Sequence, residues 1–190
     1  LDLPAGAADM PGVIVPRKCV NEVRKLLDEM AADAPVEIGL SPAKVRFRFS
    51  ADSTLTSKLI DGTFPDYTRV IPTANDKLLK IDAKVLAEGV DRVAAIATTE
   101  KTRAVKLALG RDKVTLSVTS PENGTASEEV PADYAAADIE VGFNYRYLLD
   151  ILGQVGSDLV DVHLADASAP TLIRENDEAK ALYVLMPMRV

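Results

Sequence analysis

The sequence is poor in the residues that support covalent or metal chemistry. It holds one cysteine, Cys19, one histidine, His163, and no tryptophan among its 190 residues. A single cysteine excludes an intrachain disulfide and a zinc site with four cysteine ligands, and it favours a reducing compartment. We therefore expect a fold that depends on its hydrophobic core and carries no cofactor.

Long apolar runs are missing as well. The apolar stretches fall well short of the ~18 residues that a membrane span needs. Residues 1–16 lack the basic start and apolar core of a signal peptide. From these two absences we expect a soluble, cytoplasmic protein.

Nucleotide-binding and catalytic motifs are also absent. Neither GxxxxGK[ST] nor GxGxxG occurs, so nucleotide hydrolysis is not expected. Asp161 and His163 share one strand face and could hold a metal, although a polar outer face is the favoured interpretation. Cys19 falls on an apolar helix face, where a core role is favoured over that of a nucleophile. The acidic pairs are expected to be solvated surface, so we predict no enzyme.

Charge and composition restrict the possible partners. Hydrophobic residues make up 47% and charged residues 27% of the chain, enough to build a globular core. The net charge of −7 argues against a surface coated with nucleic acid or anionic lipid. The 22 Lys and Arg residues can still form a basic surface on one face. Any contact with DNA must therefore be local.

A pattern of strand, helix and strands recurs along the chain, with copies about 60 residues apart. Asp82 and Asn144 are expected to cap two of the helices. Three such copies predict an α+β architecture with sheets outside and helices together on one side. The predicted elements are a helix over 17–30 with strands over 36–40, 45–50 and 54–60; a strand over 78–81, a helix from Asp82 to Val93 and strands over 105–109 and 114–118; and a strand over 139–143, a helix over 145–155 and strands over 160–164 and 182–186.

The last residues, 184–190, read VLMPMRV and place apolar side chains at a terminus, where polar residues are usual. A final core strand explains Val184 and Leu185. It does not explain residues 186–190, because Pro187 has no amide donor and interrupts strand pairing. The two methionines beside it offer a polarizable surface that adapts to different ligands.

Several stretches resemble the family of bacterial DNA sliding clamps, the beta subunits of DNA polymerase III. They are VIVPRK at 13–18, TSKL at 56–59, DGTFPDY at 61–67, GFN at 142–144, YLLD at 147–150 and YVLMPMR at 183–189. The resemblance implies a DNA clamp fold of repeated strand-helix-strand units, with helices lining the inner face. Residues 1–75 would be the second half of the middle domain, and residues 76–190 the third domain. A half domain would expose the apolar face that its other half covers.

The resemblance also implies a function and its residues. The family encircles duplex DNA as a head-to-tail homodimer, without reading base sequence, and tethers the DNA polymerase III alpha subunit, the clamp loader and other proteins that carry short clamp-binding motifs. An acidic scaffold that binds proteins but no nucleic acid is the alternative. The implied residues are Arg17 and Lys18 for DNA; Ile96, Ala97, Glu122, Glu128 and Glu129 for the dimer interface; and Pro65, Arg69, Val70, Thr102, Asn144, Tyr147, Ser168, Pro170, Val184, Met186, Pro187, Met188, Arg189 and Val190 for a peptide-binding cleft.

Overall fold

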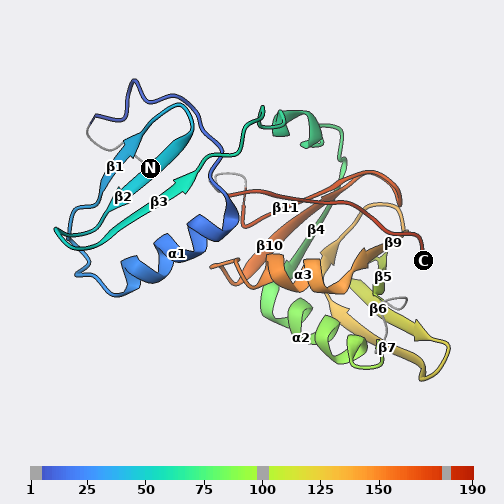
Figure 1. Cartoon of the computed structure of the whole chain (residues 1–190). Coiled ribbons are helices and arrows are strands. Elements are labelled where there is room, and N and C mark those ends of the chain that lie inside the picture. The colour runs from blue at the N-terminus through green and yellow to red at the C-terminus, as the bar shows by residue number, and fades with distance from the viewer. Residues whose placement is uncertain (1–5, 98–102, 177–180) are drawn as a thin grey trace. The chain divides into compact units, whose positions relative to one another are not determined.

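The computed structural model describes residues 6–97, 103–176 and 181–190. The chain forms two compact units, Leu1–Asp66 and Tyr67–Val190 (Figure 1). The boundary near residue 75 that the resemblance implies falls inside the second unit, between a short 3-10 helix, η1 (Tyr67–Val70), and the first strand of that unit, β4 (Lys77–Asp82).

The first unit contains one helix and one antiparallel sheet. Helix α1 (Arg17–Asp28) precedes β1 (Glu37–Leu40), β2 (Lys44–Arg48) and β3 (Thr54–Lys58), which lie in the order β1-β2-β3. The helix and the three strands confirm the elements predicted for this part of the sequence. Cys19 is buried on α1, as its place on the apolar helix face indicated.

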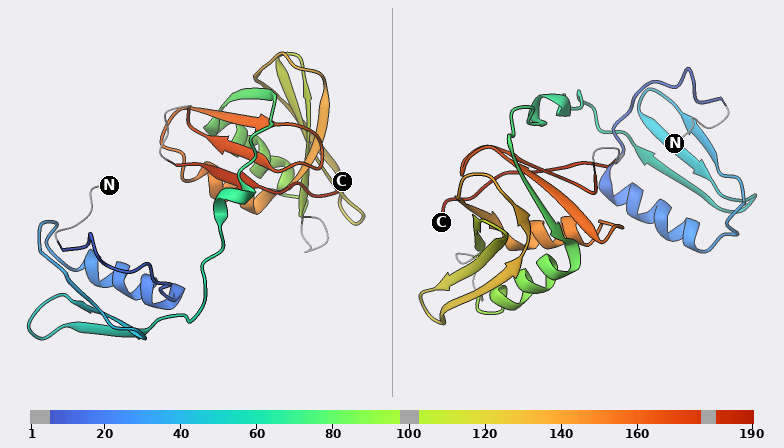
Figure 2. Two further views of the ribbon diagram at one scale, coloured as in Figure 1. Left: turned by 90° about the horizontal axis from the view of Figure 1, so that it is seen from above. Right: turned by 180° about the vertical axis from the view of Figure 1, so that it is seen from behind.

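The described residues of the second unit form two antiparallel sheets and two α-helices. Its elements are β4, α2 (Ala83–Ala94), β5 (Ala104–Gly110), β6 (Lys113–Ser120), β7 (Gly124–Pro131), β8 (Asp133–Tyr134), β9 (Ile139–Asn144), α3 (Tyr145–Leu152), β10 (Leu159–Leu164), β11 (Thr171–Arg174) and β12 (Tyr183–Leu185). One sheet has the order β12-β11-β10-β4-β8 and the other β7-β6-β5-β9. Figures 1 and 2 show α2 and α3 next to each other on one side of this unit.

Both helices of the second unit start at the residues predicted to cap them. The Asp82 carboxylate accepts a hydrogen bond from the backbone N–H of Val85 at 2.8 Å. The Asn144 side-chain oxygen accepts one from the N–H of Arg146 at 3.1 Å. Each bond satisfies a backbone donor that the first turn of a helix leaves unpaired. Because each cap is also the last residue of a strand, it fixes the point at which strand becomes helix.

The core of the second unit lies between its sheets and helices. Val105, Leu107 and Leu109 of β5 alternate with more exposed residues and pair with the buried strand residues of β6 and β9. Leu86, Val90 and Val93 of α2 and Leu148 and Leu152 of α3 complete the same core. Within the described residues, no helix is long and apolar enough to span a membrane.

Asp161 is more buried than a polar outer face predicts, whereas His163 is partly exposed. Asp161 is buried, with 6% of its surface exposed, and lies between its cross-strand neighbours Lys80 and Arg174. The Lys80 ammonium stands 3.8 Å from the Asp161 carboxylate, and Arg174 Nε donates to His163 Nε2 at 3.2 Å. The Lys80 ammonium compensates part of the cost of burying this carboxylate. No group of metal-binding side chains is found in the parts of the chain that the structure describes.

Candidate functional site

The tail after β12, residues 186–190, presents the apolar side chains that the sequence singled out. β12 pairs with β11, where Val184 lies opposite Leu172, and Leu185 is buried in the core. Beyond this anchor Met186, Met188 and Val190 are 60%, 39% and 64% exposed.

The tail returns to the four-stranded sheet at one point. The Met188 N–H donates to the carbonyl oxygen of Gly142 on β9 at 2.8 Å, which forms an isolated antiparallel bridge. In Figure 1 this last segment is drawn in dark red and ends at the mark C. The backbone is therefore held before the tail, at Leu185, and within it, at Met188, while Met186, Met188 and Val190 remain accessible.

The strand that receives the tail leads directly into two more of the predicted cleft residues. Asn144 ends β9 and is buried at 7% exposure, with its side-chain oxygen engaged in the cap of α3. Tyr147 lies in the first turn of α3 and is 57% exposed. Asn144 thus fixes the start of α3, whereas the Tyr147 side chain is accessible on the first turn of that helix.

The connection between β10 and β11 holds two more of the predicted cleft residues, Ser168 and Pro170. The Asp166 carboxylate accepts hydrogen bonds from the Ser168 hydroxyl at 2.7 Å and from the N–H groups of Ser168 and Ala169 at 2.7 and 2.8 Å. These bonds, led by the Ser168 hydroxyl, lower the pKa of Asp166 below its ordinary value. The loop is therefore held by its own hydrogen bonds.

The Asn75 amide connects this loop with the segment that follows η1. Its Nδ2 donates to the carbonyl oxygens of His163 at 2.8 Å and Pro170 at 3.0 Å. Sequence reasoning missed Asn75, since nothing in the local pattern distinguishes a bridging asparagine from a turn residue. In η1 itself, Val70 is 58% exposed and Arg69 is also exposed.

The two predicted cleft residues that remain are Pro65 and Thr102. Pro65 is an exposed residue of the first unit. Thr102 lies outside the described residues. The other predicted cleft residues belong to the second unit and lie in η1, β9, α3, the β10–β11 loop, β12 and the tail.

Helix α1 carries a basic surface in an otherwise acidic chain. Its polar side lines a shallow hollow with Arg17, Lys18, Asn21, Glu22, Arg24, Lys25 and Asp28. Four of these side chains are basic and two are acidic, and Lys25 pairs with Glu22 at 3.0 Å. Arg17 and Lys18 are exposed in the first turn, where backbone N–H groups are also unpaired within the helix. This surface suits an anion such as a phosphate group.

The predicted interface residues differ in their exposure. Ala97 is 8% exposed and belongs to the core of the second unit, and Ile96 packs against that core. Glu129 pairs with Lys113 at 2.6 Å, and Glu122 is exposed in the turn between β6 and β7. β7 is the edge strand of its sheet, so one side of its backbone is open to pairing.

Glu128 explains why the sequence did not reveal β7 as a strand. It occupies an inward position opposite Leu116, where the neighbouring inward residues of β7 are Ala126 and Val130. Its carboxylate accepts two hydrogen bonds from the Arg92 guanidinium, at 2.6 and 2.9 Å. Arg92 thereby lowers the pKa of Glu128 below its ordinary value. A glutamate at an inward position interrupts the alternation of apolar and polar residues that predicts a strand.

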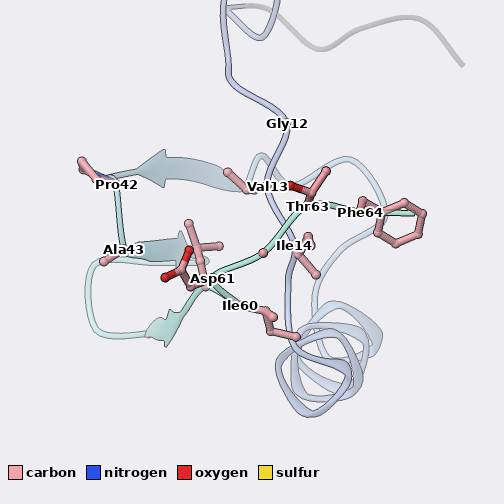
Figure 3. Close-up of a pocket in the computed structure, with 11 residues that line it drawn as sticks. Gly12, Val13, Ile14, Pro42, Ala43, Ile60, Asp61, Thr63 and Phe64 are labelled. Carbon is pink, nitrogen blue, oxygen red and sulfur yellow. The ribbon is translucent and has the colours of Figure 1, made fainter. Parts of the chain in front are cut away.

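A pocket of about 810 Å³ lies in the first unit (Figure 3). Its walls come from the segments 12–14, 42–43 and 59–64, and the Ile60 N–H donates to the Ile14 carbonyl at 2.9 Å. Among its described lining residues Asp61 is the single ionisable side chain. General acid–base catalysis usually needs one group that donates a proton and another that accepts one. The described lining of this pocket offers a single carboxylate, so it gives no such pair.

Known proteins resemble this chain over almost its whole length. The chain is 49% identical to the beta sliding clamp of Caulobacter vibrioides over 187 residues, which cover 98% of this chain and 49% of that relative. It is 40% identical to the beta sliding clamp of Pseudomonas aeruginosa over 190 residues, which cover 100% of this chain and 51% of the relative. The chain thus spans about half the length of the curated relatives it matches.

A solved structure gives the same result for the fold. The sliding clamp of Bartonella birtlesii bound to griselimycin matches all of this chain and 50% of its own, with a TM-score of 0.92 and 48% sequence identity. The α+β clamp fold is therefore confirmed. Residues 1–66 match the central domain of the DNA polymerase III beta subunit and residues 68–189 its C-terminal domain. The chain belongs to the DNA polymerase III beta subunit family.

Proposed function

We propose that this chain is part of a sliding clamp that encircles duplex DNA and tethers a replicative polymerase to it. The observation that carries the proposal is the tail, whose backbone is anchored at Leu185 and Met188 while Met186, Met188 and Val190 remain exposed. An apolar surface of this kind suits a short peptide with two or three apolar side chains. The protein would catalyse no reaction and would work in the cytoplasm.

The partner site is the cleft formed by the tail and its neighbours. Its ligands would be short motifs of the DNA polymerase III alpha subunit, the clamp loader and other clamp-binding proteins, and the griselimycin complex of the Bartonella birtlesii clamp is consistent with a ligand site in this family. Burial of two or three apolar side chains contributes about 1.5 to 3 kcal/mol each. After the cost of ordering the peptide, this suggests a Kd near micromolar.

The DNA-facing surface would be the polar side of α1. Arg17 and Lys18 are exposed and stand at the start of the helix, where charge and unpaired N–H groups can both address a phosphate. Contacts limited to phosphates do not read base sequence, which a sliding ring requires. This assignment separates the proposal from an acidic scaffold that binds no nucleic acid.

The ring would close through the edge of the four-stranded sheet. β7 offers an open edge, with Glu122 and Glu129 exposed beside it. Ile96 and Ala97 would contribute little surface, because they pack into the core of their own unit. In a full-length homodimer, the acidic edge would meet a basic surface of the other subunit. Residues 1–75 would then be half of a middle domain and residues 76–190 the third domain.

Deletion of residues 186–190 from a full-length subunit tests the partner site. The truncated protein should lose binding to a synthetic peptide with the clamp-binding motif of the alpha subunit, measured by calorimetry. Ring formation and the thermal midpoint should barely change, because these residues follow the last strand and are largely exposed. Unaltered affinity after the deletion would refute the cleft assignment.

A further inference from the structure

Gly142 is a glycine in the interior of a strand, without a backbone reason to be one. It lies in β9 opposite Lys106 of β5. The described glycines with positive φ are Gly6 and Gly124, so Gly142 does not need the left-handed conformation that glycine permits. A glycine inside a strand weakens it, because it has no side chain to pack, and it often marks a place where another backbone approaches closely.

The tail makes such an approach at Gly142. A Cβ atom added at this position would lie 2.7 Å from the carbonyl oxygen of Met188 and closer still to Cγ1 of Val190. The Val190 side chain can rotate, but the Met188 oxygen belongs to the backbone and moves only if the tail moves. Because the Met188 N–H also donates to the Gly142 carbonyl at 2.8 Å, that movement would stretch or break the bridge.

The bridge controls the part of the tail that faces a ligand. Leu185 is buried in the core and Met188 is bound at β9, so Met186 and Pro187 span the distance between two fixed points. Chain held in this way has already lost much of its freedom before a ligand arrives, which lowers the cost of binding. If the second point were released, only the fraction of molecules with a docked tail would bind, and the apparent Kd would rise by the inverse of that fraction.

We propose that Gly142 is a positioning residue for the partner-binding cleft. Its missing side chain lets the tail dock against β9 and so places Met186 and Met188 for a peptide. The inference rests on the proposed function, since it assigns a role within the same cleft. Gly142 would then determine partner affinity although it lies in the sheet and contacts no ligand.

Gly142→Ala in a full-length subunit tests the proposal, with Gly110→Ala as the matched control. Gly110 lies in β5 of the same sheet, and a Cβ there would meet a single neighbour, Oδ1 of Asp138, at an ordinary 3.9 Å. Calorimetry with the alpha-subunit motif peptide should give a Kd about tenfold higher for Gly142→Ala, if the docked fraction falls to about one in ten. Gly110→Ala should leave the Kd within about twofold.

Two further measurements separate positioning from a general loss of structure. Hydrogen exchange of the Met188 amide should accelerate in Gly142→Ala, while the amides of β5 keep their protection. Adding Val190→Ala to Gly142→Ala should restore part of the protection of the Met188 amide, because it removes the contact with Val190 Cγ1. Unchanged peptide affinity in Gly142→Ala, with the Met188 amide still protected, would overturn the proposal.

If Gly142→Ala does not fold, hydrogen exchange of the unaltered protein still tests the docking of the tail. In that protein the Met188 amide should exchange more slowly than the Arg189 amide, because Met188 is bonded to Gly142. Equal exchange rates would overturn the tail anchor. Absence of peptide binding by the unaltered protein, together with a protected Met188 amide, would instead refute the proposed function and leave the docking of the tail supported.

Discussion

The two units of the chain share the order of helix and strands but differ in how completely they bury their apolar residues. In the second unit, two sheets and two helices enclose a continuous core that includes Tyr134 and Phe143. In the first unit, the buried apolar side chains among the described residues are Cys19, Val45 and Phe49. Val20 and Ile60 of that unit remain 52% and 50% exposed.

This difference shows that an amphipathic pattern predicts which face is apolar but not what covers it. Helix α1 has the spacing of a core-facing helix, yet Leu27 is 46% exposed and Cys19 is its single buried residue. Helix α2, of the same length, buries Leu86, Val90 and Val93. Because burial of apolar area is the main stabilising contribution, the first unit should be much less stable than the second.

Hydrogen exchange of this chain provides the largest expected contrast. Amides of α1 should exchange at least about a hundredfold faster than amides of α2, because few buried side chains oppose local opening of the first unit. Mass spectrometry with peptide resolution would measure both helices in one sample. A chain of residues 67–190 serves as the control, in which α2 should keep its protection. Equal protection of α1 and α2 would break the comparison between the units.

The proposed roles of the two units predict a second contrast, in DNA binding. Arg17→Glu with Lys18→Glu in a full-length subunit should reduce retention on primed circular DNA by about tenfold at physiological salt, since two phosphate contacts become repulsive. Binding of the alpha-subunit peptide should not change, because the cleft residues of the second unit are untouched.

Lys44→Glu with Lys58→Glu is the matched control for that double substitution. These two residues are exposed cross-strand neighbours in the sheet of the same unit, so the change in net charge is identical. DNA retention should stay close to that of the unaltered protein, because the resemblance places the sheets on the outside of the ring. An equal loss in both double variants would indicate a general charge effect and count against α1 as the DNA-facing surface.

The elements that the sequence predicted correctly depend on local signals. Asp82 and Asn144 cap the helices that follow them, and alternation in β5 and β6 identified two strands. β7 was missed because Glu128 stands at an inward position, and β11 because four residues give too little pattern. The partner that stabilises Glu128 at its inward position is Arg92, which lies 36 positions away and outside the local pattern of β7.

Residues that shape the site were harder to find than the residues that line it. The tail attracted notice through Pro187 and its methionines, which are unusual in a terminal strand. Asn75 and Gly142 act through contacts with Pro170 and Met188, which are distant in sequence. The burial of Asp161 between Lys80 and Arg174 was unpredictable for the same reason, because each of its neighbours lies on another strand.

Asn75→Ala should have a smaller effect that stays within the second unit. The substitution leaves the partly buried carbonyls of His163 and Pro170 without the Asn75 donor, which typically lowers stability by about 1 to 3 kcal/mol. The β10–β11 loop would loosen, and peptide affinity should fall severalfold. Asn75→Asp is the control for shape, since it keeps the size but removes the donor and should be at least as damaging. Full peptide affinity in both variants would show that Asn75 does not support peptide binding.

The smallest predicted effect concerns pH and the pair formed by Arg92 and Glu128. Arg92 lowers the pKa of Glu128, so the folded form holds the charged carboxylate more strongly than the unfolded form does. The contribution of the pair is fully present above the ordinary pKa of a glutamate, about 4.3, and it is lost as the pH falls through the lower pKa of the folded form. Thermal melts between neutral pH and about pH 3 should therefore show a midpoint decrease that is smaller in Glu128→Gln than in the unaltered protein.

A double-substitution cycle would isolate this effect within the second unit. Arg92→Gln and Glu128→Gln should each remove the same pH-dependent contribution, and the double variant should lose no more than either single one. The expected change in midpoint is at most about 3 °C, because both side chains are partly accessible to solvent. Additive losses would show that the two side chains stabilise the protein separately, and Glu128 would then hold its inward position on β7 without help from α2.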